Sequence, residues 1–196
     1  MELALVAEDD LSMAVLERVC AATRRDVVVA RRLVERGVGN IRRSLGKYRN
    51  ASHVLPHLVL ADLDRSPCPP ALLAEWRAAP LPPGLLLRLA VRATESWLLG
   101  DAETFAAFAG VPRHRVPDRP EEEADPKATL IGVVRRSRQV RLREEIVPAT
   151  GSALKIGPRY NERLIPYVRQ HWRPEQAAAA CPSLARLGQR LRQFRT

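Results

Sequence analysis

Acidic side chains follow three of the four apolar runs that we interpret as strands. They are Glu8 after the first run, Asp62 and Asp64 after the third, and Glu95 just past the fourth. The carboxyl ends of parallel strands meet at one edge of a sheet, and ligands of α/β proteins bind at that edge. Carboxylate oxygens are the ligands that Mg²⁺ prefers, and a cation also relieves the repulsion between neighbouring acids. The four acids therefore predict a site for Mg²⁺ or Mn²⁺.

Asp62 and Asp64 form an Asp-x-Asp pair around Leu63. In extended backbone the two acids point the same way, and Leu63 faces the core. Each acid alone also has an ordinary role, since Asp forms turns at strand ends and acids charge the first turn of a helix. The acidic run 8–10 fits that ordinary role as well. Because Glu8 and Glu95 are expected at the same edge of the sheet, we favour the metal site.

Apolar runs alternate with helical patterns through the first half of the chain. We expect strands at residues 2–7, 26–30, 57–61 and 85–91. We expect helices after Ser12, at 40–50, after the proline cluster 67–70, and from Thr94. Strands that alternate with helices form a parallel sheet covered on both faces. The predicted fold class is therefore α/β, with a parallel sheet of about four strands and flanking helices.

The rest of the chain has no convincing strand. Residues 112–126 contain four prolines and three successive glutamates, which is the composition of a loop, lid or linker. Helical patterns follow at 126–138, 161–172, 174–180 and 183–194. We expect an α/β domain at 1–111, an acidic Pro-rich loop at 112–126, and a small, basic helical part at 127–196 packed on the first domain.

The net charge of +10 comes from the C-terminal third of the chain. Residues 135–196 hold 14 Lys+Arg and 4 Asp+Glu, while the preceding residues hold 18 of each. Such an excess suits a polyphosphate, because cations that neutralise phosphates release counterions. A biased base composition of the genome could produce the same excess of arginine, which would then lie on a solvated face. The candidate contacts to DNA or RNA are Arg135, Arg136, Arg138, Arg141 and Arg159.

Composition and spacing disfavour several other classes of protein. The apolar runs are far shorter than the ~20 residues that span a bilayer, so we expect no membrane contact. The first residues lack the basic start and long apolar stretch of a signal peptide, which predicts a cytoplasmic protein. Cys20, Cys68 and Cys181 are an odd number with no close pair, so we expect reduced thiols. The four histidines show no metal-ligand spacing.

The order of the acids resembles the toprim domain, the Mg²⁺-binding fold of topoisomerases, primases and overcoming-lysogenization-defect nucleases. That domain has a Glu after its first strand and Asp-x-Asp after its third, as Glu8 and Asp62-Leu63-Asp64 are placed here. Residues 93–101 are similar to the Glu-Ala/Ser-Trp-Leu-x-x-Asp signature of the toprim-like DUF4276 family. Similar segments follow in the same order at 105–111, at Asp125-Pro126-Lys127 and at 151–164.

The resemblance implies a Mg²⁺-dependent nuclease of DNA or RNA. Asp62 and Asp64 would hold Mg²⁺, and Glu8 would act as a ligand or as a general acid/base. Glu95 would hold a second cation, and Lys127 would neutralise charge that develops on the phosphate. Relatives of this kind are often encoded beside an AAA-type ATPase, so the resemblance also implies an ATPase partner in an anti-phage system.

Two departures from the family pattern keep a second interpretation open. The family usually has Gly after the first Glu and a second acid four residues on, where this chain has Asp9 and Met13. These changes suit a catalytically silent toprim-like module that binds nucleic acid or a partner through basic helices. A response-regulator receiver is a third interpretation, because residues 6–10 resemble its opening, although its later Thr/Ser and Lys-Pro have no counterparts.

Aromatic residues are assigned no catalytic role. Tyr48, Tyr160 and Tyr167 lie on expected helices, which disfavours a topoisomerase with a tyrosine nucleophile. Trp97 stands among apolar residues and is expected to be a core residue that seats Glu95.

Overall fold

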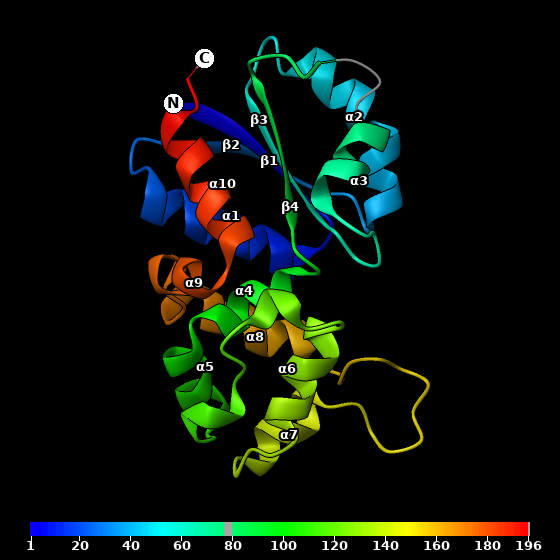
Figure 1. The fold of residues 1–196 in the computed structure, drawn as a ribbon, viewed down its shortest axis with the longest axis vertical. Coiled ribbons are helices and arrows are strands. Elements are labelled where there is room, and N and C mark those ends of the chain that lie inside the picture. The colour runs from blue at the N-terminus through cyan, green and yellow to red at the C-terminus, as the bar shows by residue number, and fades with distance from the viewer. Residues whose placement is uncertain (77–79, 196) are drawn as a thin grey trace. The chain divides into compact units, whose positions relative to one another are not determined.

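The computed structural model describes residues 1–76 and 80–195 (Figure 1). This described part divides into two compact units, one of residues 1–91 and 183–196 and the other of residues 92–182. The first carries the strands, and we call it the sheet unit; the second is helical, and we call it the helical unit. The boundaries between these units, after residues 91 and 182, differ from the boundaries of the expected ranges 1–111, 112–126 and 127–196.

The sheet unit is built on parallel strands. In the described ranges these are β1 (Glu2–Ala7), β2 (Val28–Val34), β3 (His57–Asp62) and β4 (Leu85–Ala90). Their order across the sheet is β2-β1-β3-β4, and each neighbouring pair is parallel. The predicted α/β class with a parallel sheet of about four strands is therefore confirmed, and the arrangement is consistent with a toprim-like fold.

The strand β2 begins later and ends later than the sequence predicts. The apolar run covers 26–30, whereas the strand spans Val28–Val34 and includes Arg31 and Arg32. Among the described residues β2 is an edge strand whose neighbour is β1, and its side chains are largely exposed. A strand in this position need not be apolar, so the hydrophobic pattern marks its beginning and not its end.

Helices cover both faces of the sheet. α1 (Asp10–Thr23) and α10 (Pro182–Gln193) lie on one face, and α2 (Val38–Ala51) and α3 (Pro69–Trp76) lie on the other (Figure 1). Val6 and Val59 pack with Ile41 and Leu45 of α2 in a buried cluster that reaches Trp76 of α3. The intervening strand residues, such as Leu5, point to the opposite face, because side chains alternate along a strand.

The last helix, α10, belongs to the sheet unit. The Val91 N–H donates a hydrogen bond to Ser183 Oγ at 3.3 Å, and Arg24 Nη1 donates to the Phe194 carbonyl oxygen at 2.5 Å. The buried leucines of α10 are Leu184, Leu187 and Leu191. The basic C-terminal residues are therefore shared between the two units, because the apolar stripe of α10 is buried in the core of the sheet unit.

The helical unit is organised around α4 (Thr94–Gly100). The other helices are α5 (Ala102–Ala109), α6 (Pro126–Val134), α7 (Val140–Ile146), α8 (Tyr160–Gln170) and α9 (Pro174–Ala180), with 3-10 turns at Arg113–Arg115 and Pro120–Glu122. α4 contacts α5, α6 and α9, and its Trp97 is fully buried, as predicted. Throughout the part of the chain that the structure describes, no helix is both long and apolar enough to cross a membrane.

Two segments of the helical unit differ from expectation. Residues 112–126, expected as a loop, contain the two 3-10 turns, lie inside this unit and bury Val116 and Pro120. The helix α7 was not predicted. It is short, and the charged Glu145 is buried beside Leu142 and Ile146, so its sequence shows no apolar stripe.

Glycine allows α4 and α9 to approach closely. A Cβ atom at Gly100 would lie 2.5 Å from Cys181 Sγ and 2.9 Å from the Ala177 carbonyl oxygen. Cys181 Sγ also donates a hydrogen bond to the Ser96 carbonyl oxygen at 3.3 Å. Gly100, in the Leu-Leu-Gly-Asp segment that ends α4, is therefore needed for α4 and α9 to pack closely.

Gly100→Ala is expected to destabilise the protein by about 1–3 kcal/mol, the usual cost of overpacking. Gly132→Ala is the matched control, because Gly132 lies within α6 and a Cβ there meets nothing within 4 Å. Helix propensity predicts that this control gains about 0.5–1 kcal/mol. Urea unfolding measures both values, and equal effects of the two substitutions would contradict the close packing of α4 on α9.

Candidate functional site

Glu8 and Asp62 meet at the carboxyl edge of the sheet. Glu8 directly follows β1, and Asp62 is the last residue of β3. The two strands are paired with Val6 opposite Val59, which brings the residues after them to the same level. The Asp62 N–H donates a hydrogen bond to Glu8 Oε1 at 2.7 Å, and both residues are half-buried. The structure thus brings these two predicted site residues together.

Asp64 lies in the turn that follows β3. Its φ is 50°, in the left-handed region, so the extended backbone that the sequence argument assumed ends at Asp62. The two acids are therefore not both in extended backbone, because a turn begins where the strand was expected to continue. Leu63 is nevertheless buried, as predicted, and Asp62 and Asp64 both line one pocket of about 280 Å³.

This pocket lies between the start of α2 and the helix α3. Val38 and Gly39, the first two residues of α2, contribute to its wall, together with Arg42. Arg42 Nη1 pairs with Glu75 Oε1 at 2.7 Å, and both side chains are more than half exposed. An exposed ion pair of this kind contributes about 0–1 kcal/mol, so it can rearrange at little cost when a ligand enters.

The neighbouring acids have structural roles. Asp9 is the N-cap of α1, and its Oδ1 accepts a hydrogen bond from the Ser12 N–H at 2.8 Å. Asp10 lies in the first turn of the same helix, where its negative charge interacts favourably with the helix dipole. Met13, which stands where the resembled family has an acid, is 5% exposed and packs in the core.

Within residues 1–76 and 80–195, no three His, Cys, Asp or Glu side chains group closely enough to hold a metal ion. In the sheet unit the Glu8 carboxylate contacts the Asp62 backbone, and the side chains of Asp62 and Asp64 line one pocket. Mg²⁺ usually takes one or two carboxylates from the protein and completes its shell with water and substrate phosphates. Two carboxylates that line one pocket, Asp62 and Asp64, are as many as such a site usually takes from the protein.

Glu95 is a buried carboxylate of the helical unit. It lies in the first turn of α4 and is 2% exposed. The Tyr160 hydroxyl donates to Glu95 Oε1 at 3.0 Å, and Lys127 Nζ lies 3.3 Å from the same oxygen. A cation and a hydrogen-bond donor offset the cost of burying the charge. Two residues that the sequence singled out, Glu95 and Lys127, are therefore partners.

The Asp-Pro-Lys segment explains how Lys127 reaches this position. Asp125 caps α6, accepting a hydrogen bond from the Ala128 N–H at 2.9 Å, and Pro126 begins the helix. Lys127 is consequently fixed in the first turn of α6. Tyr160 was not assigned a role from the sequence, although it ends the Gly-Pro-Arg-Tyr segment on which the family resemblance partly rests.

Asp101 forms a second buried ion pair in the helical unit. Its Oδ1 accepts from Arg173 Nη2 at 2.7 Å, and its Oδ2 accepts from Arg173 Nε at 3.0 Å and from the Arg173 N–H at 2.9 Å. Burial alone would raise the pKa of Asp101, but hydrogen bonds from Arg173 and Thr104 and the charge of Arg173 hold it below its ordinary value. The Asp of the 93–101 segment therefore has a structural role.

The pair of Glu95 and Lys127 can be tested by a double-mutant cycle. Lys127→Met leaves a buried carboxylate without its cation and is expected to cost about 2–3 kcal/mol. Glu95→Gln is expected to cost less, because the amide oxygen still accepts from Tyr160. The double variant should recover at least about 1 kcal/mol relative to the sum of the two single effects, measured by chemical denaturation.

Lys155→Met is the control for this cycle, because Lys155 is exposed on the loop before α8. Its effect is expected to stay within about 0.5 kcal/mol. Purely additive effects of the changes at 95 and 127 would show that the pair does not stabilise the fold.

Arginines gather around Glu145 of α7. Among the described residues, Arg141 Nε and Arg159 Nη1 donate to Glu145 Oε1 at 3.2 and 2.8 Å, and Arg163 Nε donates to Oε2. Burial alone would raise the pKa of Glu145, but the hydrogen bonds from Arg163 and Arg141 and the nearby positive charges hold it below its ordinary value. Glu145 therefore positions a cluster that keeps an excess of positive charge.

The Glu145 cluster contains some of the predicted nucleic-acid contacts. Arg141 and Arg159 belong to it, and Arg163 was missed because nothing in the local sequence links it to Glu145. The η nitrogens of Arg141 and Arg163 make no hydrogen bond within residues 1–76 and 80–195. The remaining candidates, Arg135, Arg136 and Arg138, are exposed on the connection between α6 and α7.

The cysteines and tyrosines agree with the sequence analysis. Cys20, Cys68 and Cys181 are all free thiols, and burial raises the pKa of Cys20 to about 12. Tyr48, Tyr160 and Tyr167 lie on helices, as expected.

A scan against models of protein families and searches of curated proteins and of solved structures found no match to this chain. The resemblance to toprim and DUF4276 proteins therefore rests on the residues quoted above and enters the argument as a proposal.

Proposed function

We propose that this chain is a divalent-cation-dependent phosphodiesterase that cleaves DNA or RNA, with Glu8, Asp62 and Asp64 as its acidic centre. The hydrogen bond of 2.7 Å from the Asp62 N–H to Glu8 Oε1 carries the proposal. It couples the acid expected to transfer a proton with the acid expected to hold the cation. In the resembled toprim nucleases these two roles belong to acids after the first and third strands.

The donor set suits Mg²⁺ or Mn²⁺. Asp62 and Asp64 offer hard carboxylate oxygens on a pocket that opens to solvent. When bound, the cation would neutralise phosphodiester charge and lower the pKa of a water molecule. Glu8 would then hold a proton or release it to the displaced oxygen, a role that the fixed contact with the Asp62 backbone would orient.

The positive groups on the same pocket suit a phosphate. The N-cap of α2 is Gly37, which supplies no side-chain acceptor to the first N–H groups of that helix. Helix N-termini favour anions, and Arg42 adds a full charge on the next turn. The carboxylates would thus hold the cation, and the start of α2 and Arg42 would hold the phosphate of the phosphodiester.

The wider parts of the proposal rest on the resemblance. They are action in the cytoplasm, an AAA-type ATPase partner and a role as effector of an anti-phage system. The expected roles of Glu95 with a second cation and of Lys127 with the phosphate also remain predictions, since these two residues pair with each other in the helical unit.

Cleavage of supercoiled plasmid and of single-stranded RNA tests the proposal, with Mg²⁺, Mn²⁺ or EDTA and with or without a neighbouring ATPase. We expect cleavage only with the divalent cation. Asp62→Asn keeps the backbone contact to Glu8 but weakens the ligand, and Glu8→Gln removes proton transfer, so each should lower the rate at least about 100-fold. Mg²⁺ should also raise the melting temperature of the wild type and not of Asp62→Asn.

Asp26→Asn is the matched control, because Asp26 is an exposed acid that pairs with Arg24 before β2. It should cleave at the wild-type rate. Cleavage in EDTA, or an undiminished rate in both site variants, would overturn the assignment of the acidic centre.

A second candidate function is a silent module that binds nucleic acid. The observation that favours it is the Glu145 cluster, whose guanidinium groups are held in place with donors facing solvent. The structural roles of Asp9 and Met13 also agree with a site that lacks outer ligands. Arginine held in this way loses little entropy on meeting a phosphate.

Replacement of Arg138 and Arg141 by Gln tests the basic surface. The affinity for a generic duplex should become less dependent on salt, by up to about 0.9 log units in slope for each lost phosphate contact. The control replaces Arg113 and Arg119, which pair with Asp118 and Glu122 in the segment 112–126, outside the Glu145 cluster. Equal slopes for both double variants, measured by fluorescence anisotropy, would remove the Arg surface from the proposed interface.

A further inference from the structure

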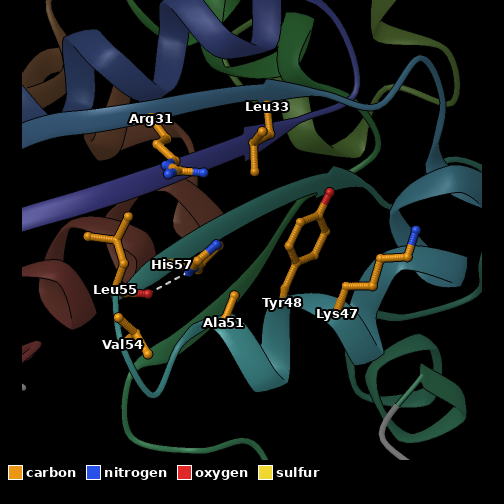
Figure 2. Close-up of a pocket in the computed structure, with 8 residues that line it drawn as sticks. All are labelled: Arg31, Leu33, Lys47, Tyr48, Ala51, Val54, Leu55 and His57. Atoms are coloured by element: carbon orange, nitrogen blue, oxygen red, sulfur yellow. Dashed lines mark hydrogen bonds between the residues drawn. The ribbon is translucent and has the colours of Figure 1, made fainter.

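A second pocket of the sheet unit lies at the opposite end of β3 from the acids. It has a volume of about 340 Å³ and is bounded by β2, the last turns of α2 and the first residue of β3 (Figure 2). Its volume falls at the lower end of the range for small-molecule sites. Among the described residues, no carboxylate lines it.

His57 presents an acceptor to this pocket. The residue is 4% exposed, and its Nδ1 lies 2.6 Å from the Leu55 carbonyl oxygen. A carbonyl can only accept, so Nδ1 is the donor, and when the ring is neutral Nε2 is an acceptor. Nε2 makes no hydrogen bond within residues 1–76 and 80–195, and Figure 2 shows that nitrogen directed into the pocket.

Arg31 brings a positive charge to the same space. Figure 2 shows its guanidinium reaching over His57 from β2. Arg31 pairs with no acid in the described ranges, whereas its neighbour Arg32 pairs with Glu17 of α1 on the other face of the sheet. Lys47 lines the pocket as a second cation without an ion pair to any described residue. Because no carboxylate among the described residues lines the pocket, Arg31 makes it suitable for an anion.

The remaining walls are apolar and aromatic. Leu33 and Leu55 both line the pocket, and the rings of Tyr48 and His57 lie 5.7 Å apart with an interplanar angle of 34° (Figure 2). The Tyr48 hydroxyl donates to Glu35, which fixes the ring as a wall. A flat, weakly polar body can be buried between such surfaces.

We propose that this pocket binds a nucleoside monophosphate whose base carries an exocyclic amine. The base would lie among Leu33, Leu55 and the Tyr48 ring, and its amine would donate to His57 Nε2. The phosphate would meet Arg31, and its charge near −2 would attract that cation more strongly than the single charge of an aromatic carboxylate. The site is distinct from the acidic centre and goes beyond the proposed phosphodiesterase function.

Titration of the full chain with AMP, followed by NMR and calorimetry, tests this proposal. We expect shifts at residues 31–33 and 48–57, and at least about tenfold weaker binding of adenosine and of ribose 5-phosphate, which each lack one half of the ligand. Arg31→Met should weaken AMP about tenfold or more, as the loss of a charge-assisted hydrogen bond predicts. Arg32→Met is the matched control and should bind AMP as the wild type does.

His57→Phe keeps a ring against Tyr48 but removes the acceptor, and it should lose the preference for AMP over ribose 5-phosphate. Asp62→Asn should bind AMP normally, so a failure of the acidic centre and a failure of this pocket are distinguishable. Equal affinity of wild type and Arg31→Met, tighter binding of benzoate than of AMP, or shifts confined to the Asp62 edge would each overturn the proposal.

Discussion

The parallel pairing of β1 with β3 is the constraint on which both proposed sites depend. In this register Val6 lies opposite Val59, and the two valines share one buried cluster. Toward the carboxyl ends, the register carries Glu8 to the level of Asp62, where a carboxylate meets a backbone N–H. Toward the amino ends, it sets His57 on the wall of the second pocket. A slip of one residue would turn every side chain to the other face, so burial of the valines holds both ends in place.

Charges organise the helical unit as apolar packing organises the sheet. Glu95, Asp101 and Glu145 are buried carboxylates, and each takes its cation from another helix or its flank. Lys127 joins α6 to α4, and Arg173 joins the start of α9 to the end of α4. An unpaired buried charge is strongly unfavourable, so arrangements of the helices that separate these partners are penalised. The ion pairs therefore select one packing of short helices that have weak apolar patterns of their own.

The sheet and its acidic edge could be predicted because both follow from local periodicity and from the direction of parallel strands. Other features depend on contacts that no local pattern marks. Glu144 and Glu145 are adjacent, yet the first is exposed and the second is buried among arginines. Asp9 has the residue type of a ligand, but one hydrogen bond from the Ser12 N–H makes it a helix cap. The arginines of β2 are compatible with a strand only because an edge position leaves them in solvent.

The helical unit is an insertion within the sheet unit, since residues 92–182 separate β4 from nearly all of α10. A ribosome therefore releases all the strands, and then the complete helical unit, before the leucines of α10 emerge. Until that moment the sheet lacks part of the cover on one face, although its strands are made before the helical unit. Domains often fold in the order of their synthesis. Here the sheet must wait for its last packing partner until the inserted unit has been made, and the inserted unit has the opportunity to fold before the sheet unit is complete.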